Sequence, residues 1–187
     1  MNTFFNILFN TNDTFDYLDN QLEGKLESNS NLIFIIFGAI CGIESFFKEY
    51  QYFDEYPIII VALGIILFAI GFSLIIGRYL ITYILYSIGK LFSNNGKVID
   101  IRVIVAYALI PRFLGFPIIL FLSLNSKPLI AGSVGYWVLM GFNYLIWLWT
   151  LKILIQGLMK FHNYGILKGI INISPFLLLY IIMNIIK

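Results

Sequence analysis

The sequence has few of the residues that build catalytic or metal sites. It contains one cysteine, Cys41, and one histidine, His162, among 187 residues. One cysteine cannot form a disulfide bond within the chain, and the two residues together cannot supply a metal site rich in His and Cys. Charged residues make up only 12% of the chain, against about 25% in a typical soluble domain. The net charge of +2 gives no sign of a nucleic-acid partner.

Catalytic motifs are missing as well. There is no glycine loop followed by Lys-Ser or Lys-Thr that would bind phosphate. Gly71-Phe72-Ser73 is not followed by a residue and a glycine, so it is not a nucleophile elbow. His162 lacks acidic or nucleophilic partners nearby, and we expect it to be a solvated loop residue. We therefore predict no catalytic residue, no cofactor and no metal, and we expect the protein not to be an enzyme.

What the chain has instead is apolar sequence in long runs. Hydrophobic residues make up 60% of it, and its mean hydropathy is +0.89. A helix needs about 20 mostly apolar residues to cross a bilayer core about 30 Å thick. Five segments meet or approach that length, and they cover about residues 31–47, 57–85, 103–124, 134–159 and 166–186. The sequence therefore predicts an all-α, polytopic membrane helix bundle with five transmembrane helices, formed by residues 31–187.

The distribution of basic residues predicts the orientation. With the N-terminus in the cytoplasm, six basic residues lie in cytoplasmic segments and three lie outside. The six are Lys25, Lys90, Lys97, Arg102, Lys160 and Lys168, and the three are Lys48, Lys127 and Lys187. Because cytoplasmic loops carry the excess of Lys and Arg, we expect the N-terminus inside and the C-terminus outside.

Residues 1–30 differ from the rest of the chain. Phe15, Leu18, Leu22 and Leu26 recur at three- and four-residue spacing, with acidic residues on the other face. This pattern predicts an N-terminal amphipathic helix over Asp13–Glu27, in a cytoplasmic or interfacial segment. In one interpretation such a helix is a burial surface, packed under the bundle or lying in the membrane interface. In the other it is a docking surface for a cytosolic partner. The sequence leaves both interpretations open.

Small residues and prolines recur within the predicted spans. Glycines at four- or seven-residue spacing let helix backbones approach closely in lipid, so we expect helix packing there. These glycines are Gly38, Gly42, Gly64, Gly71, Gly165 and Gly169. Kinks are expected at Pro111, Pro117 and Pro175, since each proline removes a backbone donor. The carbonyl groups of Tyr107, Phe113 and Ile171 would then lack their usual partners.

Four polar residues within the spans are the candidate functional positions. Arg112 falls near the middle of its span, where a charge costs about 2.5–3.5 kcal/mol on insertion scales. Glu44 is the one carboxylate inside a span and could pair with Arg112; alternatively, Arg112 bonds the carbonyl groups that the prolines free. Asn143 and Thr150 form a polar stripe on one helix face. Arg78 and Lys152 lie near helix ends, where long side chains reach water.

Two segments carry a family resemblance. In GKLFSNNGKVIDIRVIVAYALIPRFLGFP, a short loop precedes an apolar span with Ala106-Tyr107-Ala108 and Pro111. In WLWTLKILIQGLMKFHNYGILKGIINISP, the elements are Trp147, Gly157-Leu158, Lys168-Gly169 and Pro175. Both resemble the YIP (Ypt/Rab-interacting protein) family of integral membrane proteins. The resemblance implies five spans and a cytosolic N-terminus. The Asp-Leu-x-Gly-Pro motif of eukaryotic members is absent, as in a bacterial-type member.

Two functions are compatible with these observations. The first is a non-enzymatic membrane protein of the bacterial cytoplasmic membrane, which acts in membrane organisation or trafficking through helix packing and recruitment of a cytosolic protein. The alternative is a small transporter or channel with a polar path near Arg112 and Asn143. The alternative requires a homo-oligomer, since five spans leave little room for a pore. Either function has the lipid bilayer as its partner, and neither involves nucleic acid.

Overall fold

The computed structural model describes residues 3–53, 55–93, 95–124 and 134–185, and the description below refers to these residues. They form helices joined by turns, with no strand among them, which confirms the predicted all-α class. The helices, in chain order, are α1 (Thr3–Phe9), α2 (Thr11–Asp19), α3 (Glu23–Glu49), η1 (Tyr50–Phe53), α4 (Ile58–Ser73), η2 (Leu74–Ile81), α5 (Thr82–Phe92), α6 (Val98–Ala108), α7 (Ile110–Leu124), α8 (Val134–His162) and α9 (Ile166–Ile185).

The second predicted span belongs to one continuous helical rod. The segments α4, η2 and α5 follow one another without a break from Ile58 to Phe92. The η2 segment is π-helical, and the hydroxyl of Thr82, the first residue of α5, donates back to the carbonyl of Gly77 within it at 2.9 Å. Side chains that insert in this way widen a helical turn. Gly77 itself lies against the ring of Phe34 on α3, where a Cβ atom would come within 2.6 Å of the ring.

The third predicted span is broken near its start. Helix α6 ends at Ala108, Leu109 forms a turn, and α7 begins at Ile110. Pro111 therefore lies in the first turn of a new helix, where its missing N–H group costs little. Pro117 and Pro175 lie inside α7 and α9. The hydroxyl of Ser174 donates to the carbonyl of Ile171 at 2.8 Å, so one carbonyl freed by a proline has a partner.

The N-terminal region differs from the single amphipathic helix expected over Asp13–Glu27. Helix α2 ends at Asp19, the chain turns, and α3 begins at Glu23 and runs on through residues 30 and 31. The backbone N–H of Gln21 donates to the carbonyl of Leu18 in this turn. Phe15 and Leu18 are fully buried, whereas Leu22 is 82% exposed. The apolar stripe is therefore divided between two helices, because the turn directs Leu22 away from the bundle.

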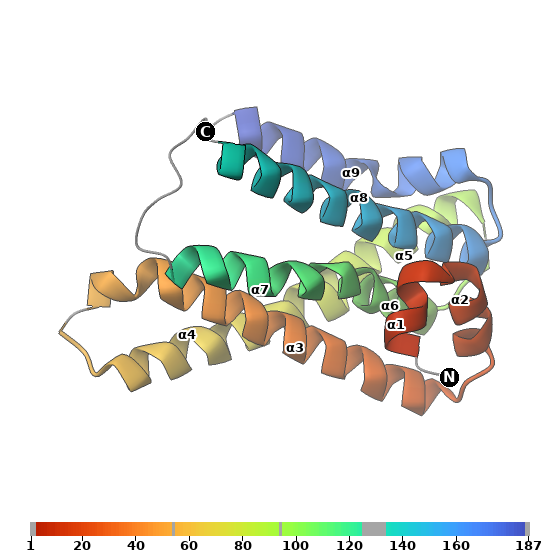
Figure 1. Cartoon of the computed structure of the whole chain (residues 1–187). Coiled ribbons are helices and arrows are strands. Elements are labelled where there is room, and N and C mark those ends of the chain that lie inside the picture. The colour runs from red at the N-terminus through yellow and green to blue at the C-terminus, as the bar shows by residue number, and fades with distance from the viewer. Residues whose placement is uncertain (1–2, 54, 94, 125–133, 186–187) are drawn as a thin grey trace.

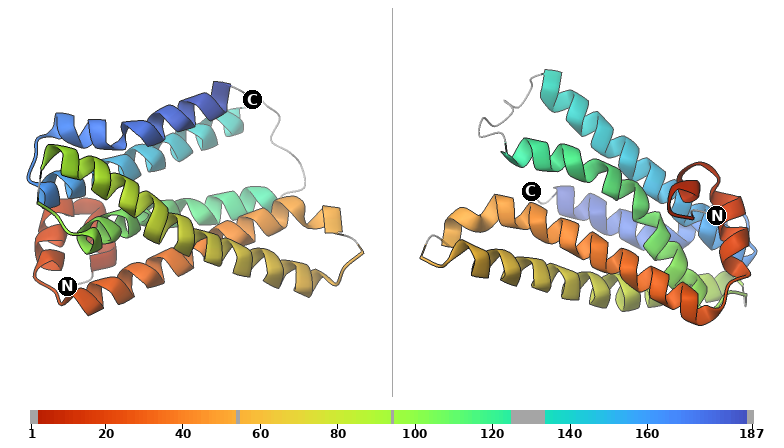
Figure 2. Two further views of the ribbon diagram at one scale, coloured as in Figure 1. Left: turned by 180° about the vertical axis from the view of Figure 1, so that it is seen from behind. Right: turned by 60° about the horizontal axis from the view of Figure 1, so that its bottom comes forward.

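The helices run in alternating directions along one bundle (Figures 1 and 2). Helices α3 and α4 lie side by side, α7 lies beside α3, and α8 pairs with α9. Helices α1 and α2 pack against one end of the bundle, far from the last turn of α9. The core of that end contains fully buried residues from several helices, among them Ile101, Ile104, Ile153 and Leu158.

Three described helical stretches are long and apolar enough to cross a membrane. They are Glu23–Glu49, Ile58–Phe92 and Met140–His162. In the second, the most apolar stretch has a mean hydropathy of 3.0, and only 6% of it is buried within the chain. A helix that is apolar on all sides and yet uncovered is typical of a membrane span. The apolar stretch Ile166–Leu179 is shorter, and five spans remain a prediction.

Candidate functional site

Arg112, Asn143 and Glu44 come together from three helices. Nη1 of Arg112 on α7 donates to Oδ1 of Asn143 on α8 at 3.3 Å, and the guanidinium lies 4.7 Å from the centre of the Trp147 ring. Glu44 lines the same small cavity, of about 20 Å³, together with Cys41. None of the ion pairs between described residues joins Glu44 to Arg112. An amide and an aromatic ring therefore contact the arginine for which the sequence left two partners open, the Glu44 carboxylate or the carbonyl groups freed by the prolines.

Thr150 does not belong to this polar group. It lies two helical turns beyond Asn143 on α8, is buried, and is not among the residues that line the cavity. Its hydroxyl has no hydrogen-bond partner among the described residues. Gly157 continues the same stripe, and there a Cβ atom would lie 2.7 Å from a side-chain carbon of Ile104 on α6. The stripe thus packs against other helices instead of lining a continuous polar path.

The six glycines that the sequence singles out fall into two groups. At Gly38 and Gly42 on α3, an added Cβ atom would lie 2.6 Å from Cα of Ile70 and 2.7 Å from Cα of Ile66, both on α4. These two glycines therefore permit backbone contact between α3 and α4. At the other four of these glycines the surroundings are looser: Gly169 has neighbours at 3.2 Å or more, and Gly64, Gly71 and Gly165 have none within 4 Å.

A charged cluster, formed by Glu27, Arg78, Arg102 and Tyr79, lies where α3, η2 and α6 meet. Oε1 of Glu27 accepts from Nη2 of Arg78 at 2.6 Å and from Nη1 of Arg102 at 3.0 Å. Both guanidinium groups also lie over the ring of Tyr79, at 5.1 and 6.0 Å from its centre. The sequence alone left Arg78 as a side chain reaching water, counted Arg102 only toward the orientation of the chain, and did not single out Glu27. All three charged residues lie near the predicted cytoplasmic ends of spans, and this common position could have indicated that they meet.

Two further ion pairs fix the ends of neighbouring helices. Nζ of Lys97 donates to Oε1 of Glu23 at 2.7 Å, and this exposed contact raises the pKa of Lys97 above its ordinary value. Lys160 on α8 pairs with Asp16 on α2. The backbone N–H of Lys97 also donates to Oδ2 of Asp100 at 2.8 Å, which caps the start of α6. These contacts hold α2 and the start of α3 against the same end of the bundle.

The single histidine is a core residue, contrary to the expectation of a solvated loop position. His162 is 0% exposed and lies at the end of α8. Its Nδ1 lies 2.9 Å from the carbonyl oxygen of Asn95, and its ring stacks on Tyr164 at 5.3 Å between centres. A Cβ atom at Gly89 would lie 2.2 Å from Nε2. The histidine therefore joins α5, α8 and the turn before α6, and its role there is packing.

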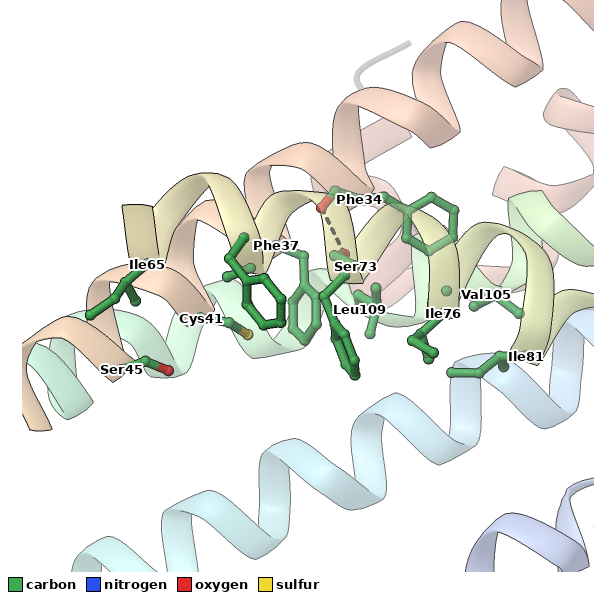
Figure 3. Close-up of a pocket in the computed structure, with 14 residues that line it drawn as sticks. Phe34, Phe37, Cys41, Ser45, Ile65, Ser73, Ile76, Ile81, Val105 and Leu109 are labelled. Atoms are coloured by element: carbon green, nitrogen blue, oxygen red, sulfur yellow. Dashed lines mark hydrogen bonds between the residues drawn. The ribbon is translucent and has the colours of Figure 1, made fainter. Parts of the chain in front are cut away.

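A large apolar cavity lies within the bundle. It has a volume of about 500 Å³ and lies between α3, α4, η2 and α6 (Figure 3). Its lining includes Phe34, Phe37, Phe72, Ile76 and Val105. The hydroxyl of Ser73, one of the few polar groups in the lining, already donates to the carbonyl of Phe34 at 2.9 Å. Such a surface offers van der Waals contact and little hydrogen bonding.

Metal-binding geometry is absent from the part of the chain that the structure describes. No three His, Cys, Asp or Glu side chains there are grouped so that they could hold a metal ion. The chemistry available is therefore ion pairing at one end of the bundle, one polar group within the spans, and a large apolar cavity between them.

These features define the chain as a helical integral membrane protein. A family model described as the Yip1 domain matches residues 5–186, and the chain belongs to this family. The match confirms the resemblance to the YIP proteins that two segments of the sequence carry. No curated protein and no solved structure matches the chain significantly.

Proposed function

We propose that this protein is a non-enzymatic, bacterial-type member of the Yip1 family that organises the membrane or membrane traffic by recruiting a cytosolic protein. In this proposal it lies in the cytoplasmic membrane and crosses it five times, with the N-terminus inside and the C-terminus outside. The alternating helices and the separation of α1 from the end of α9 are consistent with an odd number of crossings (Figure 1).

One observation carries the recruitment: a fixed acidic surface on α2. Phe15 and Leu18 anchor the helix and are fully buried, while Asp13, Asp16 and Asp19 lie on its exposed side. Because Asp16 pairs with Lys160, the helix is also held by an ion pair. A rigid surface loses less conformational entropy when a partner binds than a free tail does, and carboxylates favour a partner with a basic surface.

The polar group around Arg112 gives less support to the transporter alternative. Its cavity is about 20 Å³, which is space for about one water molecule. Arg112 and Asn143 bond to each other, and Thr150 lies outside the cavity. A solute path through one copy of the chain would need these groups to separate. A path between copies would require an oligomer.

The test compares two double variants in cells by site-specific cross-linking from Tyr17, which lies on α2. We expect a discrete cross-linked cytosolic protein with the native chain and its loss in Asp13→Asn/Asp19→Asn. The control Glu49→Gln/Glu55→Gln removes two acidic residues at the opposite end of the bundle and should keep the product. Cross-linking that survives the α2 variant would refute recruitment through this surface, and solute flux in proteoliposomes would favour the transporter.

A further inference from the structure

The charged cluster and the apolar cavity share the same helix faces. On α3, Glu27, Phe34 and Cys41 follow one another at seven-residue spacing, and the last two line the cavity. Val105 on α6 and Leu109 in the turn after it line the cavity, and Arg102 lies one helical turn before Val105 on the same side of α6. Seven residues of helix span about 10 Å. The charged cluster therefore lies at one end of the cavity, about two helical turns from Phe34.

The cluster retains one positive charge in excess. Two arginines surround one carboxylate, and Nε of both Arg78 and Arg102 is buried without a hydrogen-bond partner among the described residues. The side chain of Arg102 is 11% exposed, whereas the side chain of Arg78 is 23% exposed and can be reached from the surface. Unpaired buried donors beside a net positive charge favour an anion with several acceptor oxygens.

The cavity beside the cluster fits a hydrocarbon chain. Its volume of about 500 Å³ lies within the range of about 300–1,000 Å³ that is typical of ligand pockets. Its wall includes Phe37, Phe72, Ile76 and Ile81 from α3, α4 and η2. Figure 3 shows Phe34, Phe37, Ile76 and Ile81 among the side chains that surround this cavity. In a membrane, the lipids around the helices supply acyl chains of this kind.

We propose that this composite site binds one anionic phospholipid. The phosphate lies against Arg78 and the charge of Arg102, and one acyl chain occupies the apolar cavity between α3, α4 and η2. An anionic lipid is favoured over a zwitterionic one because the cluster has one uncompensated positive charge. The site is independent of the acidic surface of α2, so the proposal does not rest on recruitment of a partner.

The experiment measures lipid retention by native mass spectrometry. The full chain is purified in mild detergent and equilibrated with phosphatidylglycerol or with phosphatidylcholine of the same acyl chains. We expect one phosphatidylglycerol to be retained with about tenfold higher affinity than phosphatidylcholine, corresponding to about 1.4 kcal/mol. Arg78→Gln should abolish this preference, whereas Lys25→Gln, which removes a basic residue that is exposed on α3, should retain it.

A second pair of variants tests the acyl-chain portion of the site. Ile76→Trp adds a larger side chain to the wall of the cavity and should lower retention of both lipids. Ile75→Trp is the matched control, because Ile75 is next to Ile76 in the chain but is 63% exposed and lies outside this cavity. These variants test the site even where Arg78→Gln fails to fold.

Any of the following results would overturn the proposal. The first is equal retention of the two lipids by the native chain. The second is an unchanged preference in a folded Arg78→Gln protein, or unchanged retention in Ile76→Trp. The third is full displacement of phosphatidylglycerol by inorganic phosphate, since that would assign the anion site to free phosphate without an acyl chain.

Discussion

Alanine substitutions in the spans should separate the glycines that form a helix contact from those that do not. Gly38 and Gly42 face the α4 backbone, where an added Cβ atom would lie 2.6 and 2.7 Å from Cα atoms. Ordinary carbon contacts are about 3.5–4.0 Å, so α3 and α4 must move apart by about 1 Å. Backbone atoms cannot rotate away as a side chain can. We therefore expect Gly38→Ala and Gly42→Ala each to lower the free energy of unfolding by about 1–3 kcal/mol.

The matched controls are Gly64→Ala and Gly71→Ala, which lie on α4 with no neighbouring atom within 4 Å of an added Cβ. Since alanine favours a helix over glycine by up to about 1 kcal/mol, these variants should be as stable as the native chain or slightly more stable. Denaturant titration in mixed micelles, followed by tryptophan fluorescence, measures all four. Similar losses at all four positions, or none at Gly38, would refute the packing argument.

Three other predictions concern the polar groups. Glu27→Gln removes the carboxylate shared by two arginines and should lower the free energy of unfolding by roughly 1–2 kcal/mol in the same titration. The loss is smaller than for a fully buried pair because the Glu27 side chain is 43% exposed. Unchanged stability would contradict a stabilising role of these two ion pairs. His162→Ala empties a fully buried position and should cost about 2–4 kcal/mol, whereas a surface residue would cost almost nothing. Double-mutant cycles should give a coupling of about 0.6 kcal/mol between Arg112 and Asn143, and a smaller one between Arg112 and Glu44. The reverse order would favour the Arg112–Glu44 ion pair, one of the two arrangements that the sequence left open.

The sequence by itself determined the class of protein, because that depends on local quantities. Long apolar runs and scarce charge predict helices that cross a membrane, because a helix satisfies its own backbone groups in lipid. The all-α class and the match to the Yip1 family rest on the same segments. Pro111 also marks the break between α6 and α7, since a proline is accommodated in the first turn of a helix.

Tertiary structure decided which residues meet. Glycine spacing alone does not distinguish Gly38, which lies against α4, from Gly64, which lies against no other helix of the described chain. Glu27 and Arg102 are 75 residues apart, and only the packing of α3 against α6 brings them together. His162 is buried for the same reason: α5 and the turn before α6 enclose a residue that the sequence places in a loop. These contacts depend on helix rotation and neighbour order, which periodicity within one helix does not specify.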